Sequence, residues 1–199
     1  MMKIYGDAKS GNCYKIKLVC ELLQIPYEWV EMDLLAGDTQ TASFLSKNPN
    51  GKVPVLELAD GRCLAESNAI INYIAHGSNL LPAEPYDLAL VQQWQCFEQY
   101  SHEPYIAVAR FIEKYQGLPD DRREEYLSKQ VGGYKALDVM EQQLTNADYI
   151  AGKTLTTADI ALYAYTHVAH EGGFDLTNYP NIQQWFKRIE NSANYVAMG

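Results

Sequence analysis

Hydrophobic and polar positions along the first 76 residues of the chain change between strand-like and helix-like periods. Short runs at 3–5 and 27–31 combine apolar and β-favouring residues, and they predict two strands. Apolar side chains between residues 16 and 23 recur at helical spacing, so we expect an amphipathic helix that ends before Pro26. The chain therefore begins with a strand–helix–strand pattern.

The following segment predicts a hairpin between two helices. A short helix is expected at 42–46. Strands are expected at 55–58 and 62–64, because they flank Asp60–Gly61, a pair typical of tight hairpin turns. A longer helix is expected from Glu66–Ser67 onward, where isoleucines gather on one side. The order βαβαββα predicts a small mixed sheet with helices on both faces.

The residue composition and the spacing of apolar positions change after residue 76. Residues 77–86 are rich in Gly, Pro, Ser and Asn, a composition that predicts a linker. Between residues 87 and 199 the apolar positions follow helical spacing, which predicts an all-α domain. We therefore expect two domains, 1–76 and 87–199, joined by the linker 77–86.

Composition and charge narrow the range of functions. Apolar residues make up 47% of the 199 positions and charged residues 21%, as in an ordinary globular protein. The 16 Lys and Arg against 25 Asp and Glu give a net charge of −9, which disfavours nucleic acids and anionic membrane surfaces as partners. The four cysteines lack metal-binding spacing, and the chain starts directly in a strand pattern. We expect a cytoplasmic protein without a metal or a membrane span.

Three short segments of the first domain carry candidate chemistry. Ser10–Cys13 opens the first helix, where free backbone N–H groups favour an anion beside a hydroxyl or thiol. Val53–Pro54 directly precedes a strand, and a cis bond there would present the Val53 backbone to an extended peptide. Glu66–Ser67 opens a helix and suits an amino acid head group, whose ammonium would pair with Glu66.

Each segment also has a purely structural explanation. Ser10 and Ser67 stand where helix caps are common, and Glu66 suits the positive end of a helix. Pro54 in the ordinary trans form would simply start a strand. A fourth segment, Thr156–Asp159, matches a capping box, and we interpret it as structural.

Taken together, these features resemble the cytosolic glutathione transferase family. The runs at 48–56 and 64–70, and the segment 151–160, are typical of bacterial members. The resemblance covers essentially the whole chain. It implies a thioredoxin-like, glutathione-binding first domain and a helical second domain that lines the electrophile pocket. The chain resembles serine-type members, as in the tau, zeta and theta classes.

The resemblance also implies how the glutathione thiol is activated. Ser10 occupies the position of the activating residue, and its hydroxyl would donate to the sulfur and stabilise the thiolate. Lys15 follows where serine-type members carry a basic residue. Tyr5 is the alternative used by other classes, but it falls inside a strand and is expected to pack. Asn12 is expected to contact glutathione, and whether Ser10, Asn12 or Cys13 dominates activation stays open.

The other glutathione contacts follow from the same resemblance. Val53 would pair its backbone with the cysteinyl part of glutathione, and cis-Pro54 would hold that edge open. Glu66 and Ser67 would take the γ-glutamyl end. Lys52 is a candidate partner for the glycine carboxylate, with an exposed turn lysine as the alternative.

The second substrate is expected against the helical domain. Tyr105, Ile106, Ala109 and Arg110 follow a kink predicted at Glu103–Pro104 and are candidate lining residues of the electrophile pocket. Arg110 has an alternative role, pairing with an acid across the interface. The resemblance implies a small hydrophobic electrophile, a homodimer and a role in detoxification.

Three classes of function fit these features. The first is conjugation of glutathione to small electrophiles. The second is a glutathione-dependent isomerase, dehalogenase or disulfide or peroxide reductase on the same scaffold. The third is a non-catalytic ligand-binding relative, which the presence of Ser10 disfavours.

Overall fold

The structure, a computed structural model, describes residues 1–198 and divides into two compact units. The first unit contains Met1–Ser78 together with the C-terminal segment that starts at Ser192. The second unit contains Asn79–Asn191. The domain limits expected from the sequence stay a prediction. The structure adds that the C-terminal segment packs with the first unit.

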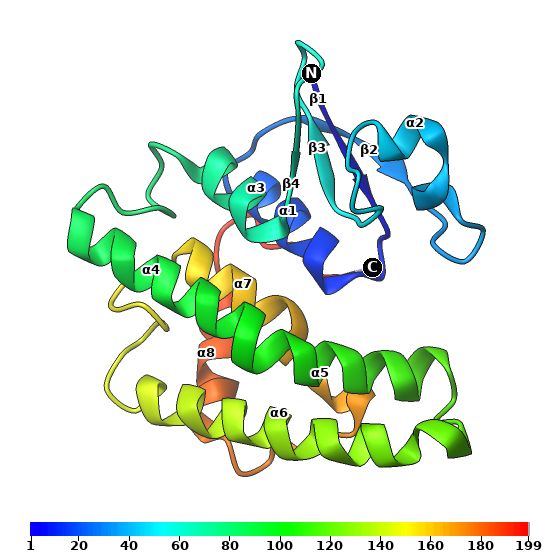
Figure 1. The fold of residues 1–199 in the computed structure, drawn as a ribbon. Coiled ribbons are helices and arrows are strands. Elements are labelled where there is room, and N and C mark those ends of the chain that lie inside the picture. The colour runs from blue at the N-terminus through cyan, green and yellow to red at the C-terminus, as the bar shows by residue number, and fades with distance from the viewer. Residues whose placement is uncertain (199) are drawn as a thin grey trace. The chain divides into compact units, whose positions relative to one another are not determined.

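A four-stranded mixed sheet with the strand order β2-β1-β3-β4 forms the centre of the first unit (Figure 1). β1 (Met2–Gly6) pairs in parallel with β2 (Tyr27–Glu31) and antiparallel with β3 (Val55–Glu57). β3 pairs antiparallel with β4 (Cys63–Ala65). The parallel pair needs a crossover, which α1 (Gly11–Leu22) supplies. The predicted order of strands and helices, and with it the thioredoxin-like fold class, is confirmed.

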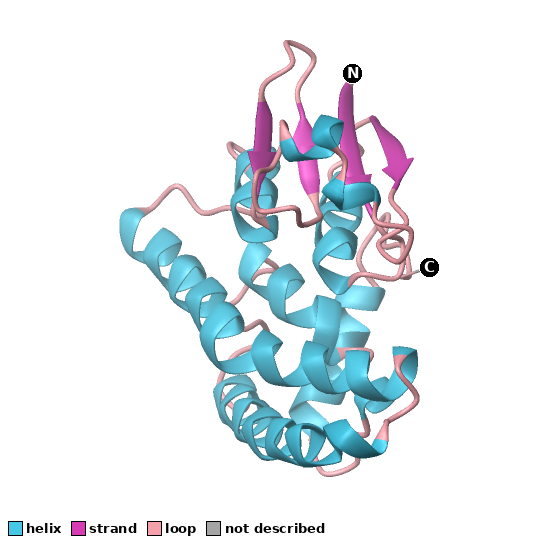
Figure 2. Ribbon diagram, turned by 45° about the vertical axis from the view of Figure 1, so that its right-hand side comes forward, coloured by secondary structure: helices cyan, strands magenta, loops and turns pink. Residues whose placement is uncertain are grey.

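The two faces of this sheet are covered by different helices. Alternate residues of a strand point to opposite faces. Tyr5 of β1 packs on Phe44 of α2 (Ala42–Leu45), which covers one face. The neighbouring Gly6 lies against α1 on the other face, where α3 (Ser67–Ala75) packs beside α1. Figure 2 shows the four strands side by side as one layer.

The strand register brings three connecting segments to one end of the sheet. Tyr5 stands opposite Val55, and Val55 stands opposite Ala65. Because both pairs are antiparallel, the residues after Tyr5, before Val55 and after Ala65 leave the sheet at the same end. The loop before α1, the Val53–Pro54 pair and Glu66 are therefore neighbours.

The second unit is built from helices. α4 (Pro85–Phe97) continues through a π-helical turn at Glu98–His102 into α5 (Glu103–Arg110) and a second π-helical turn at Phe111–Tyr115. The first π-helical turn ends two residues before Pro104, where the sequence predicts a kink, because proline cannot supply the backbone donor of a regular helix. α6 (Arg123–Leu144) lies along α5 (Figure 1).

A fully buried helix forms the centre of the second unit. All ten residues of α7 (Thr157–Thr166) are buried. α8 (Pro180–Glu190) contributes Trp185, which is completely buried and packs edge-on against Tyr163. Such a helix needs a start whose backbone donors are satisfied within the protein.

The capping box predicted at the start of α7 is confirmed. Asp159 accepts the Thr156 N–H at 2.9 Å through Oδ2. Through Oδ1 it also accepts the Ile150 N–H at 2.7 Å and the Trp185 indole N–H at 2.9 Å. This carboxylate therefore ties the start of α7 to two other segments of the helical unit.

Candidate active site

Ser10 is the N-cap residue of α1. Its backbone is extended, with φ −81° and ψ 125°, and its Oγ accepts the Cys13 N–H at 3.4 Å. This hydrogen bond is long, and a hydroxyl that accepts one bond keeps its own proton to donate to another group. The Ser10 N–H donates to the Asp7 carbonyl at 3.0 Å, which holds the loop in place. Ser10 thus presents an O–H donor at the positive end of α1.

A buried lysine joins the first turns of α1 and α3. Lys15 is completely buried, and its Nζ donates to Ser67 Oγ at 3.2 Å and to Asn68 Oδ1 at 3.5 Å. Ser67 Oγ in turn donates to Asn12 Oδ1 at 3.2 Å. A buried ammonium requires polar partners because its desolvation is costly. The network therefore fixes two predicted site residues, Asn12 and Ser67, against each other.

Glu66 adopts a strained backbone between β4 and α3. Its φ of 69° and ψ of 111° lie in a region that residues with a side chain rarely adopt. Its side chain is exposed and makes no capping hydrogen bond to α3. Strain of this kind costs about 1–3 kcal/mol and is found mainly at functional sites. The exposed carboxylate thus stands directly before the free N–H groups of the first turn of α3.

The Val53–Pro54 peptide bond is cis, as the sequence analysis predicts. Pro54 is buried, and the ladder between β3 and β4 begins only at Val55. The half-buried Val53 therefore stands before the paired part of the strand. Asn48 holds this segment, because its Nδ2 donates to the Lys52 carbonyl at 2.8 Å. The Lys52 side chain itself is exposed.

Positive groups gather at the starts of α1 and α3 in a protein with a net charge of −9. Each helix N-terminus carries roughly half a positive charge. The N-termini of α1 and α3 are linked through Asn12 and Ser67, and Lys15 adds a full positive charge beside them. The arrangement favours an anionic ligand that also donates hydrogen bonds to Glu66.

Of the two alternative activating residues, Cys13 is buried and Tyr5 is hydrogen-bonded to a carboxylate. Burial raises the pKa of the Cys13 thiol to about 12. The Tyr5 hydroxyl donates at 2.7 Å to Glu57 Oε2, which also binds Lys47 Nζ at 2.5 Å. Burial, together with the hydrogen bond to Glu57, raises the pKa of Tyr5. The Cys13 thiol is completely buried and the Tyr5 hydroxyl already donates its proton to Glu57, and this favours Ser10 or Asn12 as the group that meets a thiolate.

The four candidate residues for the electrophile pocket lie on α5 within the helical unit. Ile106 and Ala109 are completely buried, and Arg110 is only 5% exposed. Ile106 and the ring of Tyr105 both lie directly against glycines of α6. The α5 face expected to meet a substrate packs into the helical unit instead, because the α6 glycines allow close approach. A role in the electrophile pocket stays a prediction that this burial does not support.

Arg110 pairs with an acid, the alternative role predicted for it, although the partner belongs to the same helical unit. Its Nε lies 2.6 Å from Glu171 Oε2, and Lys114 Nζ lies 2.6 Å from Glu171 Oε1. Burial alone would raise the pKa of Glu171, but hydrogen bonds from these two cations hold it below its ordinary value. Arg110 is therefore committed to a structural ion pair.

The sequence pattern predicts no contact for one residue of the site, Lys15. A lysine in an amphipathic helix is normally read as a solvent-exposed position. One feature of the sequence indicates that Lys15 is buried: it lies between the apolar residues Tyr14 and Ile16, which are both buried. Its partner Ser67 lies 52 residues further along the chain, so the contact itself depends on the tertiary fold.

Comparison with known proteins identifies the family. The family model described as "Glutathione S-transferase, N-terminal domain" matches residues 1–76, and the one described as "Glutathione S-transferase, C-terminal domain" matches residues 87–193. Glutathione S-transferase F13 from Arabidopsis thaliana is 33% identical over 202 residues, covering 94% of this chain and 90% of that protein. Maleylacetoacetate isomerase from Rhizobium meliloti (strain 1021) is 30% identical and covers 89% and 85% of the two chains.

Solved structures agree with this assignment. The crystal structure of a glutathione S-transferase from Pseudomonas fluorescens Pf-5 has a TM-score of 0.98 and 63% identity, covering 99% of this chain and 98% of that one. A maleylacetoacetate isomerase from Methylobacterium extorquens AM1, with bound malonate and GSH, has a TM-score of 0.79 and 28% identity, covering 95% and 92%. The fold and both matched regions define an enzyme built on the transferase scaffold. The chain belongs to the glutathione S-transferase family.

Two further observations concern membranes and metals. Within residues 1–198, no helix is both long and apolar enough to span a bilayer. The same part of the chain holds no group of three or more His, Cys, Asp or Glu side chains placed to share a metal ion. The candidate site consists of hydroxyl, amide, carboxylate and ammonium groups.

Proposed function

We propose that this enzyme binds glutathione at the N-terminal ends of α1 and α3 and transfers its thiolate to small hydrophobic electrophiles. The observation that carries the proposal is the hydrogen-bonded chain from Lys15 through Ser67 to Asn12. It joins two helix N-termini close to Ser10, the cap residue of α1. Family membership supports glutathione as the ligand, since a relative of known structure contains bound GSH.

Each end of glutathione has a complementary group in the proposed site. The γ-glutamyl carboxylate meets the Ser67 hydroxyl and the N–H groups of α3, and the ammonium pairs with Glu66. The Val53 backbone pairs with the cysteinyl amide in the manner of an added strand. Asn12 approaches the cysteinyl part, and Lys52 pairs with the glycine carboxylate. Charged hydrogen bonds at both ends hold the sulfur near α1.

The chemical step depends on keeping the sulfur ionised. A free thiol has a pKa of about 8.5, so most of it is protonated near neutral pH. Ser10 donates its O–H to the sulfur, and the positive end of α1 further stabilises the thiolate. The thiolate attacks an electrophilic carbon and forms a C–S bond. The leaving group departs with the bonding electron pair, or an activated double bond takes up a proton from water.

A second candidate is glutathione-dependent isomerisation of maleylacetoacetate. Two relatives named as this isomerase favour it. In that reaction the thiolate adds to the unsaturated substrate and leaves again, so glutathione is returned unchanged. Consumption of glutathione therefore distinguishes transferase from isomerase activity.

We also propose that the enzyme is a cytoplasmic homodimer. Large apolar side chains are exposed in both units, including Leu35 at 96%, Tyr73 at 51% and Tyr86 at 68%. In a dimer, such side chains would be candidates for the contact between the two copies. Light scattering at micromolar concentration should give twice the mass of the chain, and the mass of a single chain would contradict the dimer.

Calorimetric titration with glutathione tests the proposed binding site. Ser67→Ala removes the hydroxyl that bridges Lys15 and Asn12, and should weaken binding about 10- to 100-fold, the range for charged hydrogen bonds. Ser46→Ala, at an exposed position of the same unit, is the matched control and should bind as the wild type does. Absence of binding to the wild type, or equal affinity in both variants, would contradict the site.

A substrate panel then separates the activities. It contains a chloronitrobenzene, a hydroperoxide, a mixed disulfide and maleylacetoacetate, each with glutathione. The proposal predicts a glutathione conjugate from the chloronitrobenzene. Turnover of maleylacetoacetate alone, with glutathione unchanged, would replace the transferase with the isomerase.

A further inference from the structure

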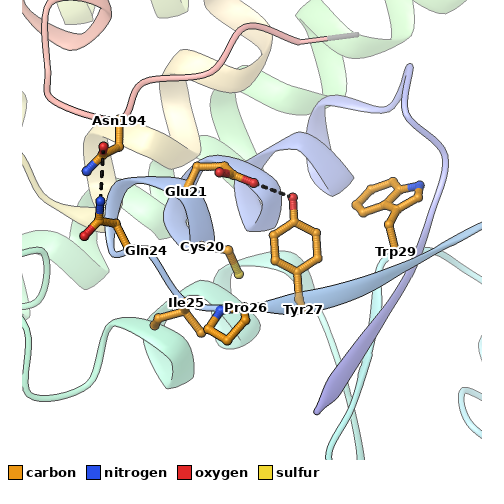
Figure 3. A pocket seen from close by; sticks show the side chains of 8 residues that line it. All are labelled: Cys20, Glu21, Gln24, Ile25, Pro26, Tyr27, Trp29 and Asn194. Atoms are coloured by element: carbon orange, nitrogen blue, oxygen red, sulfur yellow. Dashed lines mark hydrogen bonds between the residues drawn. The ribbon is translucent and has the colours of Figure 1, made fainter.

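A surface hollow of about 550 Å³ lies at the C-terminal end of α1, the opposite end of that helix from Ser10 (Figure 3). It is bounded by the last turn of α1, the link into β2, the first half of β2 and the C-terminal segment. This volume is in the range of sites for small organic molecules. Its lining side chains include Glu21, Gln24, Pro26, Tyr27, Trp29 and Asn194.

Two aromatic rings, together with Ile25 and Pro26, form the apolar part of the hollow. Tyr27 and Trp29 alternate along β2 and therefore stand on the same face of the strand, as Figure 3 shows. The Tyr27 hydroxyl donates to Glu21 Oε1 at 2.8 Å, and the Trp29 indole N–H donates to Glu31 Oε2 at 2.5 Å. These hydrogen bonds hold both rings in fixed orientations, and both rings are only half-buried.

The charge of the hollow is negative. Among its lining residues, all within the described part of the chain, Glu21 alone has a charged side chain. Tyr27 occupies Glu21 Oε1, and no group within residues 1–198 donates to Oε2. Lys17, one turn earlier in α1, makes no ion pair with Glu21 in the same range. The C-terminal end of α1 adds the negative end of a helix dipole.

The C-terminal segment supplies a polar wall. Gln24 Nε2 donates to Asn194 Oδ1 at 3.4 Å. Two residues further along, the Val196 carbonyl accepts the Tyr14 hydroxyl of α1 at 2.7 Å, which anchors the segment. The hollow is therefore formed by segments that hydrogen bonds hold together.

We propose that this hollow binds a small organic ammonium ion that carries an apolar body. The ammonium group donates to Glu21 Oε2 and lies near the negative end of α1. The body covers the exposed faces of Tyr27 and Trp29, which also attract a cation through their π-electrons. An anion of the same shape meets the Glu21 carboxylate and is repelled. The site is separate from the proposed glutathione site and does not depend on it.

A pair of probes with opposite charge tests this inference on the full chain. We expect 2-phenylethylammonium to quench the tryptophan fluorescence saturably, and 3-phenylpropionate, of similar size, to bind at least about tenfold more weakly. Glu21→Gln keeps an acceptor for Tyr27 but removes the charge, and should weaken ammonium binding about five- to tenfold. Glu28→Gln is the matched control, because its side chain is on the opposite face of β2 and lies 3.4 Å from Lys3.

Three outcomes of the binding experiments would overturn the inference. They are equal binding of the two probes, equal loss of affinity in the two variants, and displacement of the ammonium probe by saturating glutathione. The last would place the probe in the proposed glutathione site. A crystal soaked with the 4-bromo derivative of the probe gives an independent readout, since bromine should lie between Tyr27 and Trp29. Bromine found only elsewhere would also overturn the proposal.

Discussion

The starts of α3 and α7 contain similar residues, but their carboxylates make different contacts. Each combines a hydroxyl with a carboxylate within four residues, Glu66–Ser67 at α3 and Thr156–Asp159 at α7. At α7 the carboxylate is completely buried and accepts donors from three residues. At α3 the carboxylate is exposed, makes no capping bond, and sits on a strained backbone.

The difference shows what separates a structural helix start from a binding one. Where the protein's own carboxylate satisfies the donors around a helix end, the residues stabilise the fold. Where it does not, the free donors and the positive end of the helix remain available for a ligand. Substitution of Asp159 should therefore lower the stability of the fold, and substitution of Glu66 should lower the affinity for glutathione.

The largest expected effect is on stability at α7. Asp159→Ala removes the cap and leaves the Ile150 N–H and the Trp185 indole N–H without their acceptor. Loss of a cap together with two buried unsatisfied donors should lower the free energy of unfolding by about 3–5 kcal/mol. Urea denaturation followed by circular dichroism measures this change.

Asp121→Ala is the control for that experiment. Asp121 is exposed in the short turn before α6, and its replacement should change stability by less than about 0.5 kcal/mol. If Asp159→Ala were as mild as the control, the hydrogen bonds at the start of α7 would not carry the stability assigned to them.

At α3 the same kind of change should act on binding. Glu66→Ala removes the carboxylate proposed to pair with the ammonium of glutathione, so affinity should fall about 10- to 100-fold. Stability should change little, because the carboxylate makes no capping bond. Calorimetric titration and urea denaturation on the same sample report both quantities.

Glu66→Gly separates the effect of losing the carboxylate charge from the effect of relieving the backbone strain. Glycine adopts a φ of 69° readily, so relief of strain should raise the free energy of unfolding by about 1 kcal/mol relative to Glu66→Ala. Glutathione affinity should stay as low as in the alanine variant. A glycine variant less stable than the alanine variant would show that the backbone at Glu66 is not strained.

A smaller effect is expected where the C-terminal segment meets α1. Tyr14→Phe removes the hydroxyl that donates to the Val196 carbonyl, and should cost about 1 kcal/mol of stability, the usual value of one hydrogen bond. Tyr73→Phe is the control, because Tyr73 is 51% exposed. Equal stability of the two variants would mean that this contact does not hold the segment.

Local patterns allowed much of the fold to be predicted. Asp60–Gly61 predicts its hairpin because the turn needs a residue with positive φ, and Gly61 has a φ of 85°. The β1–α1–β2 unit and the capping box at Thr156–Asp159 also follow from spacing between near neighbours. These features depend on residues close together in the chain, which the sequence displays directly.

Other features depend on contacts between distant residues. The burial of Lys15 depends on Ser67, and the C-terminal segment is placed by a contact between residues 182 positions apart. The positive φ of Glu66 is imposed by the path from β4 into α3, since nothing in a glutamate favours it. The α5 residues face α6 because glycines of that helix admit them, and a helical period alone does not show which face meets a partner.

Ser10 is proposed to stabilise the thiolate of bound glutathione, and titration of that thiol tests this role most directly. Ultraviolet absorbance of the thiolate, followed against pH, should give a pKa about one to two units below the usual value of roughly 8.5. In Ser10→Ala the pKa of the glutathione thiol should rise by at least about one unit, which corresponds to roughly 1.4 kcal/mol. Conjugation should slow about 10- to 100-fold, while the affinity for glutathione should stay nearly unchanged. Cys13→Ala should leave the pKa of the glutathione thiol unchanged. If the pKa of the glutathione thiol were unchanged in Ser10→Ala but raised in Asn12→Ala or Cys13→Ala, the role of Ser10 would be contradicted, and that neighbour would be the activating residue.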